Sequence, residues 1–361
     1  MRICMVIPYD LSQEGGVKRH GFQLAAALRE LGDAVEIVGP SRSPIAERHV
    51  TSLGGVVNVE SNGSANHIGI FSSPLRVRRL LRERYFDVVH IHEPLVPSIN
   101  YYAAWSAGRA ALVGTFHAFA EQQTPRDRLV RRVWSSIAFP FYDRAIAVSP
   151  AAARLAAVTF DKPITVIPNG IVPELYTPGT VGSGLRLLFV GHWRDRRKGL
   201  PHLLSACAVL SQLGVRWSLD VVGDGGDVPR STDPNVRYHG AISSEQQVAS
   251  MYAACDVFVA PATGMESFGI VLLEAMASGR PIVCSDIEGY RYAAGDAAIF
   301  VPPGDPNALA HTLAGLDVGT RKRLAAAGRA RVRDFAWDRL ALRVRDEYVA
   351  AIADAPRAVA R

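Results

Sequence analysis

Cysteine is scarce in this chain of 361 residues, which contains only Cys4, Cys207, Cys255 and Cys284 and no C-x-x-C pair. Because each cysteine stands alone in an apolar run, we interpret all four as buried thiols of a reducing compartment, not as a disulfide framework. The chain has no D-x-D motif and no histidine–cysteine spacing typical of a metal site. The sequence therefore predicts no dedicated metal site.

Long apolar runs are also missing. None approaches the ~18 residues of a membrane-spanning helix, and the opening segment, residues 1–8, is too short and lacks the cleavage site of a signal peptide. We therefore expect a cytoplasmic protein whose contact with any membrane is peripheral. Hydrophobic residues make up 48% of the chain and charged residues 20%, a balance that predicts packed cores. The net charge of +6 permits an anionic partner: nucleotide phosphate, anionic lipid or nucleic acid.

Two successive series of alternating strands and helices predict two domains. Such alternation is typical of mostly parallel sheets covered by helices, and a Pro- and Gly-rich linker at 171–184 separates the series. We predict an α/β protein of two doubly wound, Rossmann-like domains facing a cleft, 1–170 and 185–337, with a C-terminal helix at about 338–361 that packs back on the first domain. The expected strands are Ile3–Ile7, Ala34–Val38, Val88–Ile91, Ala111–Thr115, Arg144–Val148, Thr165–Ile167, Leu185–Val190, Ser218–Val222, Val236–His239, Val257–Ala260, Pro281–Cys284 and Ala298–Val301. The expected helices include Val17–Leu31, Leu200–Leu213 and Ala308–Leu316.

Two glutamates flank a small apolar run in the segment E-S-F-G-I-V-L-L-E, which extends from Glu266 to Glu274. If 269–278 is helical, Glu274 lies inside the helix and Glu266 in the loop before it, with Ser267 or a neighbour as the cap. Backbone amides at the helix start could then face a phosphate, while the carboxylates bind a sugar hydroxyl and a ribose diol. The alternative is a surface glutamate with an ordinary helix cap.

Glycines and cations follow the first expected strand of each half. Gly15 and Gly16 open a helix and could bring backbone amides close to a phosphate, although a plain strand–helix turn is the alternative. The segment G-H-W-R-D-R-R-K-G, residues 191–199, offers three arginines and a lysine for a diphosphate, the alternative being a solvated charge run. Two histidine segments, 92–94 and 114–117, end expected strands, where open α/β sheets place ligands. Alone, each such histidine would more often be structural.

Taken together, these motifs resemble the retaining family-4 glycosyltransferases of the GT-B fold. The resemblance spans nearly the whole chain and includes I-P-N-G before the linker, R-K-G after the second-half strand and E-S-F-G-I-V-x-x-E-A-M-A-x-G. It implies a transferase that moves a hexose, mannose from GDP-mannose, to a lipid-borne acceptor such as phosphatidyl-myo-inositol. It also implies a front-face mechanism with retention of configuration, without a cofactor or a catalytic metal.

The resemblance assigns roles by position. His117 and Glu266 are the implied catalytic residues, beside the transferred sugar. The implied donor-binding residues are Gly16, His192, Arg196, Arg197, Lys198, Ser267, Phe268, Gly269, Ile270 and Glu274. The implied acceptor-binding residues are Tyr9, Lys18, Asn62, Ser64 and His67.

The chain departs from the family pattern at three places. His192 stands where the family has an arginine, so Arg196 or Arg197 is expected to supply the second cation. Lys18 replaces a glutamine, and His67 and Gly69 stand where relatives that use inositol phospholipids carry arginines. Lys18 and His67 are nevertheless expected to meet a phosphate of the acceptor.

The segment 74–85 is interpreted as a basic amphipathic helix that lies on anionic phospholipid, with leucines between five arginines. A second basic cluster lies at 126–132. An ordinary solvated helix is the alternative; nucleic-acid binding is not expected, because no recognition motif accompanies the arginines. Two other functions stay open: a related transferase that uses a UDP-sugar and a different lipid or glycan, and a non-catalytic protein that binds nucleotide sugar or membrane.

Overall fold

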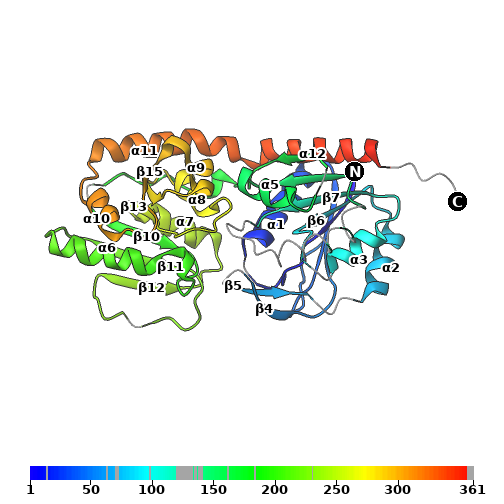
Figure 1. The fold of residues 1–361 in the computed structure, drawn as a ribbon, viewed down its shortest axis with the longest axis horizontal. Helices are drawn as coiled ribbons and strands as arrows, with labels where there is room; N and C mark the ends of the chain where they lie inside the picture. The colour runs from blue at the N-terminus through cyan, green and yellow to red at the C-terminus, as the bar shows by residue number, and fades with distance from the viewer. Residues whose placement is uncertain are drawn as a thin grey trace. The chain divides into compact units, whose positions relative to one another are not determined.

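The computed structural model describes residues 1–13, 15–61, 64–69, 73–96, 99–118, 133, 136, 141–160, 162–182, 184–229 and 231–355, and for 58–67 only the backbone. The chain forms two compact units, each an α/β domain (Figure 1). The first unit is Met1–Gly170 together with Trp337–Arg361, and the second is Ile171–Ala336. Residues 171–184 therefore belong to the second unit, and the chain returns to the first at Trp337.

The first unit contains a seven-stranded parallel sheet of order β3-β2-β1-β6-β7-β8-β9. Its strands are β1 (Arg2–Val6), β2 (Ala34–Gly39), β3 (Val50–Ser52), β6 (Val88–His92), β7 (Ala111–Phe116), β8 (Arg144–Ala147) and β9 (Ile164–Val166). Its helices are α1 (Gly16–Glu30), α2 (Pro74–Arg84), α3 (Ile99–Ser106), α5 (Pro150–Ala157) and α12 (Trp337–Asp354). The strand order reverses between β1 and β6, and ligands of doubly wound sheets bind at the carboxyl ends of the strands at such a point.

An antiparallel hairpin, β4 (Val57–Ser61) with β5 (Ser64–Ile68), accompanies this sheet and was not predicted from the sequence. The short strand β3 was also missed. Every strand that the sequence predicts is present, with ends that differ by at most one residue. The central strands β1, β6 and β7 are buried on both faces, which explains their nearly continuous apolar runs.

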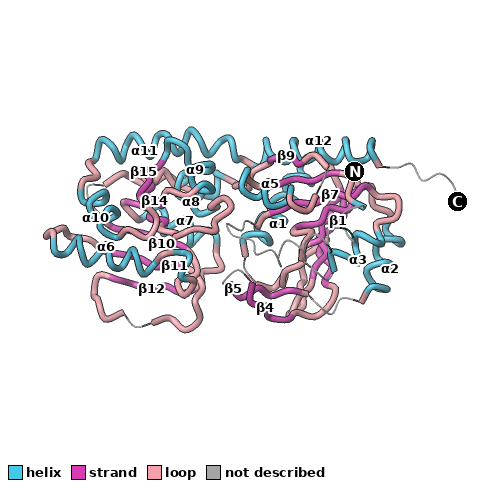
Figure 2. Tube along the Cα trace, in the orientation of Figure 1, coloured by secondary structure: helices cyan, strands magenta, loops and turns pink. Residues whose placement is uncertain are grey.

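The second unit contains a six-stranded parallel sheet of order β12-β11-β10-β13-β14-β15. Its strands are β10 (Arg186–Val190), β11 (Ser218–Val222), β12 (Val236–Gly240), β13 (Val257–Ala260), β14 (Ile282–Ser285) and β15 (Ala298–Val301). Its helices are α6 (Leu200–Gln212), α7 (Glu245–Ala254), α8 (Ile270–Ala277), α9 (Glu288–Ala294), α10 (Pro306–Ala314) and α11 (Val318–Arg331), with 3-10 turns η2 (Pro173–Leu175), η3 (Arg196–Lys198), η4 (Gly295–Ala297) and η5 (Val332–Phe335). Figure 2 shows the strands of each unit between helices. The predicted fold class is confirmed.

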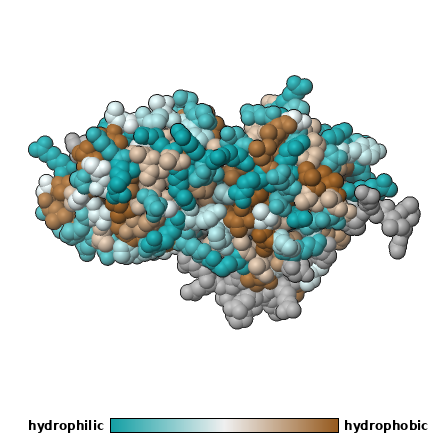
Figure 3. Space-filling model, turned by 90° about the horizontal axis from the view of Figure 1, so that it is seen from above, coloured by the Kyte–Doolittle hydropathy of each residue, from teal (hydrophilic) through white to brown (hydrophobic). Residues whose placement is uncertain are grey.

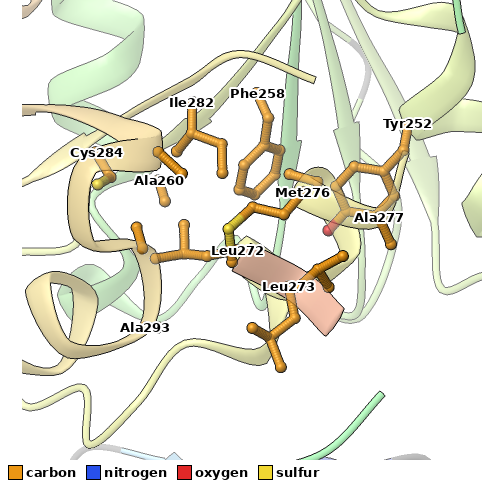
Figure 4. Close-up of a cluster of buried hydrophobic side chains, with 14 of the residues drawn as sticks. Tyr252, Phe258, Ala260, Leu272, Leu273, Met276, Ala277, Ile282, Cys284 and Ala293 are labelled. Carbon is orange, nitrogen blue, oxygen red and sulfur yellow. The ribbon is translucent and has the colours of Figure 1, made fainter. Parts of the chain in front are cut away.

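The second unit has one buried cluster between its sheet and helices α7, α8 and α9, and another that includes residues of α6 and α10. Phe258 and Ile282 from the sheet meet Leu272, Leu273 and Met276 of α8 in one cluster (Figure 4). Because α8 is buried on nearly every side, it presents little to solvent except its ends. The start of α8 is thus the part available to a ligand.

The four cysteines are buried and free, as predicted. In the part of the chain that the structure describes, no helix combines the length and the apolar character needed to cross a membrane. On the face that Figure 3 shows, hydrophobic residues form separate patches among hydrophilic ones.

Candidate functional site

In the second unit, a lysine and a glutamate that are far apart in sequence form an ion pair. Lys198 Nζ donates a hydrogen bond of 2.5 Å to Glu266 Oε1. Lys198 ends η3, after β10, and Glu266 lies in the loop between β13 and α8. Since β10 and β13 are neighbours at the point where the strand order reverses, the fold brings these two predicted residues together at the carboxyl edge of the sheet.

The loop before α8 has an unusual backbone. Gly264 and Gly269 have φ of 153° and 97°, and Met265 has a φ of 60°, which is uncommon for a residue with a side chain. Gly269, not Ser267, is the N-cap of α8, and it makes no side-chain hydrogen bond to the helix. The cap expected at Ser267 or a neighbour is therefore the neighbour Gly269. With no side chain as a cap, the first amides of α8 are left for solvent or an anion.

Glycines bring the neighbouring chain close to this loop. A Cβ on Gly289 of α9 would lie 2.2 Å from the Glu266 carbonyl oxygen, and one on Gly269 would lie 2.7 Å from the Tyr290 ring. Close packing against α9 thus fixes the segment that contains Glu266, Ser267 and Phe268. Phe268 is buried, so its contribution is to the core below the loop.

Glu274 lies inside α8, as predicted, and its side chain is buried. The Tyr252 hydroxyl of α7 donates a hydrogen bond of 2.8 Å to Glu274 Oε2. The carboxylate is thus held within the core of the second unit. Its implied contact with a ribose stays a prediction.

The cations after β10 have different surroundings. Asp195 accepts a hydrogen bond from the Arg197 backbone amide, and its carboxylate lies 2.7 Å from Arg197 Nη2. Arg196 and His192 are exposed, and His192 Nδ1 accepts a hydrogen bond from the Asp195 amide. Arg197 is thus engaged by Asp195, a residue that sequence reasoning missed. The expectation that Arg196 or Arg197 supplies the second cation stays a prediction.

In the first unit, His117 follows β7 and lies beside the end of β6. The His117 backbone amide donates a hydrogen bond of 2.9 Å to Glu93 Oε1, and His117 Nε2 lies 3.0 Å from His92 Nδ1. Glu93 has a φ of 52°, and the Asn100 amide group donates to its carbonyl oxygen at 2.7 Å. The buried Glu93 and His92 therefore position His117, roles that the sequence motif did not identify individually.

Two further histidines are buried next to His92 and His117. His20 of α1 packs edge-to-face on His117, with ring centroids 4.6 Å apart, and on Trp337 of α12. His90 has both nitrogens engaged: Nδ1 lies 2.6 Å from the Tyr348 hydroxyl and Nε2 lies 2.7 Å from Thr115 Oγ1. The C-terminal helix α12 thus supplies Trp337 and Tyr348 to this cluster.

Burial lowers the pKa of all four histidines, because a charged imidazolium loses its hydration there. The pKa falls to about 4 for His20 and about 3 for His90, and it lies well below the ordinary value for His92 and His117. His117 is therefore a neutral imidazole at physiological pH. It can exchange hydrogen bonds with a sugar or a phosphate but adds no positive charge.

The remaining predicted residues of the first unit are only partly described. Gly15 is the N-cap of α1 without a side-chain hydrogen bond, and Gly16 is the first helical residue, as the phosphate-binding interpretation requires. Burial and then the charge of Glu93 raise the pKa of Tyr9. Lys18 lies over the Phe22 ring, 5.6 Å from its centroid. Asn62 and the side chains of Ser64 and His67 lie outside the described residues.

The predicted basic helix exists as α2, but two of its three leucines, Leu80 and Leu81, do not face outward. Val77, Leu80 and Leu81 are buried against the first unit, so the interpretation that Leu80 and Leu81 lie on lipid is wrong. All five arginines are exposed; Arg79 is paired with Glu83, and Arg84 with Glu36. Helix α2 thus presents charge and the exposed Leu75 to solvent. The second basic cluster, 126–132, lies outside the described residues.

Comparison with known proteins identifies the family. Residues 14–175 match the model of "Glycosyltransferase Family 4" and residues 184–316 that of "Glycosyl transferases group 1". A phosphatidyl-myo-inositol mannosyltransferase of Mycobacterium leprae is 33% identical over 371 residues, 96% of each chain. The chain belongs to glycosyltransferase family 4. It is a glycosyltransferase with the GT-B fold.

Some more distantly related proteins are named for other glycosyl transfer reactions. A D-inositol 3-phosphate glycosyltransferase of Streptosporangium roseum is 26% identical, over 94% of this chain and 89% of its own. Among solved structures, HepE of Anabaena in complex with UDP-glucose is 18% identical and covers 97% of this chain and 99% of its own, with a TM-score of 0.74. That structural likeness supports the GT-B fold of this glycosyltransferase.

Proposed function

We propose that this glycosyltransferase moves mannose from GDP-mannose, with retention of configuration, to a myo-inositol headgroup carried by a phospholipid. The observation that carries the proposal is 33% identity over 96% of both chains with a phosphatidyl-myo-inositol mannosyltransferase. The pair Lys198–Glu266 argues for activity and against a non-catalytic sugar-nucleotide binder, because the cation and carboxylate that donor chemistry needs lie together.

The donor diphosphate is proposed to bind between Lys198 and the start of α8. Lysine forms charge-assisted hydrogen bonds with phosphate, and the uncapped amides at a helix N-terminus favour negative charge. The arriving diphosphate replaces Glu266 as the partner of Lys198, and Glu266 is released to accept hydrogen bonds from sugar hydroxyls. These cations and amides neutralise the diphosphate without Mg²⁺, so no catalytic metal is expected.

The transfer step is proposed to take place on one face of the sugar. The bond from the anomeric carbon to the diphosphate oxygen breaks, the acceptor hydroxyl oxygen forms the new bond to that carbon, and the acceptor proton moves to the departing diphosphate. Lys198 and the helix amides stabilise the charge that develops on the diphosphate. The neutral His117 supplies a hydrogen bond to the sugar, and Glu93 and His92 hold it in place.

Helix α2 is proposed to hold the enzyme at the cytosolic face of an anionic membrane. Its five arginines are exposed, two of them paired with the glutamates Glu83 and Glu36, and each cation near such a surface contributes about 1 kcal/mol. Because the buried leucines take no part, attachment is expected to be electrostatic and reversible by salt. The exposed Leu75 and Tyr85 at the two ends of α2 are the apolar groups available there.

A second candidate uses a UDP-sugar and a soluble acceptor. It is favoured by the relative named D-inositol 3-phosphate glycosyltransferase and by the UDP-glucose complex of a structural neighbour. His192, in place of the family arginine, is compatible with either donor. Donor and acceptor are therefore best tested together.

The test offers GDP-mannose, UDP-glucose and UDP-N-acetylglucosamine in turn, with phosphatidylinositol vesicles or inositol 3-phosphate as acceptor, and detects products by mass spectrometry. Mannosylated phosphatidylinositol from GDP-mannose is the expected product. Glu266→Ala, correctly folded, should be inactive, while the exposed Glu30→Ala serves as the matched control. A glycosylated inositol phosphate as the main product would favour the second candidate.

A further inference from the structure

Three buried histidines of the first unit converge from separate elements. His20 comes from α1, His92 ends β6 and His117 follows β7. We call these residues the histidine trio. One ring nitrogen of each lies within 4.8 Å of those of the other two, and His92 Nδ1 lies 3.0 Å from His117 Nε2.

The trio differs from an ordinary buried histidine in its unused nitrogens. His20 Nδ1 and His92 Nε2 are buried and have no hydrogen-bond partner among the described residues. Buried polar atoms in native proteins nearly always have one, so unpartnered atoms call for an explanation. The neighbouring His90 shows the contrast, since Tyr348 and Thr115 engage both of its nitrogens. The trio therefore carries lone pairs or N–H groups that the protein itself leaves unused.

The spacing of the trio suits one class of ligand. Zinc binds histidine nitrogens at about 2.0–2.1 Å, so two such ligands in a tetrahedral site lie about 3.4 Å apart. One ring nitrogen of each histidine lies within 4.8 Å of those of the other two, a limit that accommodates this value. Imidazole favours Zn²⁺, Cu²⁺ or Ni²⁺, whereas Mg²⁺ and Ca²⁺ prefer oxygen. Three protein ligands leave a fourth position open to water or a sugar hydroxyl.

We propose that the histidine trio binds one transition-metal ion of the Zn²⁺ class. Sequence spacing does not reveal this site, because its ligands are 72 and 25 positions apart. A bound ion would occupy a nitrogen of His117, so zinc is expected to inhibit sugar transfer. This consequence rests on the proposed function of His117, whereas metal binding does not.

The experiment uses untagged, chelator-treated full-length protein, titrated with Zn²⁺ against a chromophoric chelator and separately with Co²⁺ as a spectroscopic probe. We expect one ion per chain, a visible Co²⁺ spectrum of tetrahedral type and no binding of Mg²⁺. His20→Phe and His92→Asn should each weaken zinc binding by about tenfold or more, the scale expected when ligation is disturbed. The matched control is the double variant His49→Ala/His311→Ala, which removes two exposed histidines and should bind as wild type does.

Two outcomes would overturn the proposal: wild-type protein that binds no Co²⁺ or Zn²⁺, or zinc binding that is unchanged in both trio variants, whatever the exposed-histidine control does. The wild-type titration decides the matter even if a trio variant fails to fold, which circular dichroism would reveal. Zinc binding by the trio without inhibition of transfer would contradict the role of His117, and inactivity toward every donor without added metal would contradict the proposed function alone.

Discussion

Replacing Glu266 with glutamine should affect two steps of donor use in opposite directions. In the free protein, the Glu266 carboxylate holds Lys198 at 2.5 Å and thus competes with a diphosphate for the same cation. Glutamine keeps the size of the side chain but removes the charge. We expect Glu266→Gln to bind GDP more tightly than wild type. We expect it to transfer sugar far more slowly, because the sugar hydroxyls lose the carboxylate that accepts their hydrogen bonds.

The magnitudes follow from the exposure of the pair. The Lys198 and Glu266 side chains are 32% and 16% exposed, so solvent screens their attraction, and such a pair contributes about 0.5–1 kcal/mol. Removing the competitor should therefore tighten GDP binding about two- to fivefold. Lys198→Gln removes a charge-assisted hydrogen bond to phosphate, worth about 1.5–3 kcal/mol, and should weaken GDP binding by about tenfold or more.

Isothermal titration calorimetry with GDP and with intact GDP-mannose measures the binding affinity of both variants, and Lys322→Gln serves as the control for loss of an exposed cation elsewhere in the second unit. A Glu266→Gln variant that binds GDP as weakly as Lys198→Gln does would refute the reasoning. In that case, the ion pair would be needed to build the site, and the carboxylate would not be a competitor that the donor displaces.

Further predictions concern metal, membrane and stability. Transfer should survive chelation of divalent ions, and an activity loss that Mg²⁺ restores would contradict metal-free donor binding. Neutralising Arg76, Arg78 and Arg82 together should reduce cosedimentation with anionic vesicles much more than it reduces GDP binding. High salt should also reduce the cosedimentation of the wild-type protein. Unchanged cosedimentation of the triple variant would indicate that α2 is an ordinary solvated helix. Tyr348→Phe removes the hydroxyl that lies 2.6 Å from the buried His90 and should lower the free energy of unfolding by about 1–3 kcal/mol in a denaturant titration. An unchanged free energy of unfolding would show that water replaces the hydroxyl. The pKa of His90 is about 3 in the folded state and near 6.5 in the unfolded state, so the unfolded state binds more protons between these pH values. The free energy of unfolding, measured by denaturation, should therefore fall as the pH drops from about 6.5 toward 3. A free energy that does not change with pH over this range would contradict burial of a neutral ring.

Local sequence patterns were sufficient for the elements of the fold. The run Val257–Ala260 matches strand β13 residue for residue, because this central parallel strand is apolar and buried on both faces. The hairpin β4–β5 was missed because its polar strands lack the continuous apolar signal of a core strand. The cap of α8 was expected at Ser267 or a neighbour because serine is a common N-cap, and here the neighbouring, left-handed Gly269 precedes the helix.

The amphipathic spacing of residues 74–85 predicted helix α2 correctly, but it did not predict whether the apolar face of the helix contacts lipid or the protein core. A helix with leucines on one side and arginines on the other satisfies both a membrane surface and a protein core, because each removes the same apolar area from water. Only the packing of Leu80 and Leu81 against the first unit decided between them. The cation at Arg197 is a similar case, since the sequence contains the charge and the structure shows its partner, Asp195.

The sequence by itself determined the two parallel-sheet units and the family, and it singled out Lys198, Glu266 and His117 as candidate site residues, because each inference depends on residue types at short range or on motif order. Tertiary structure alone decided which distant groups meet: Lys198 with Glu266 across 68 positions, and His20 with His92 and His117 from three elements. It also decided that these histidines are neutral, since the pKa of an imidazole depends on burial, which arises only when segments far apart in the chain pack together.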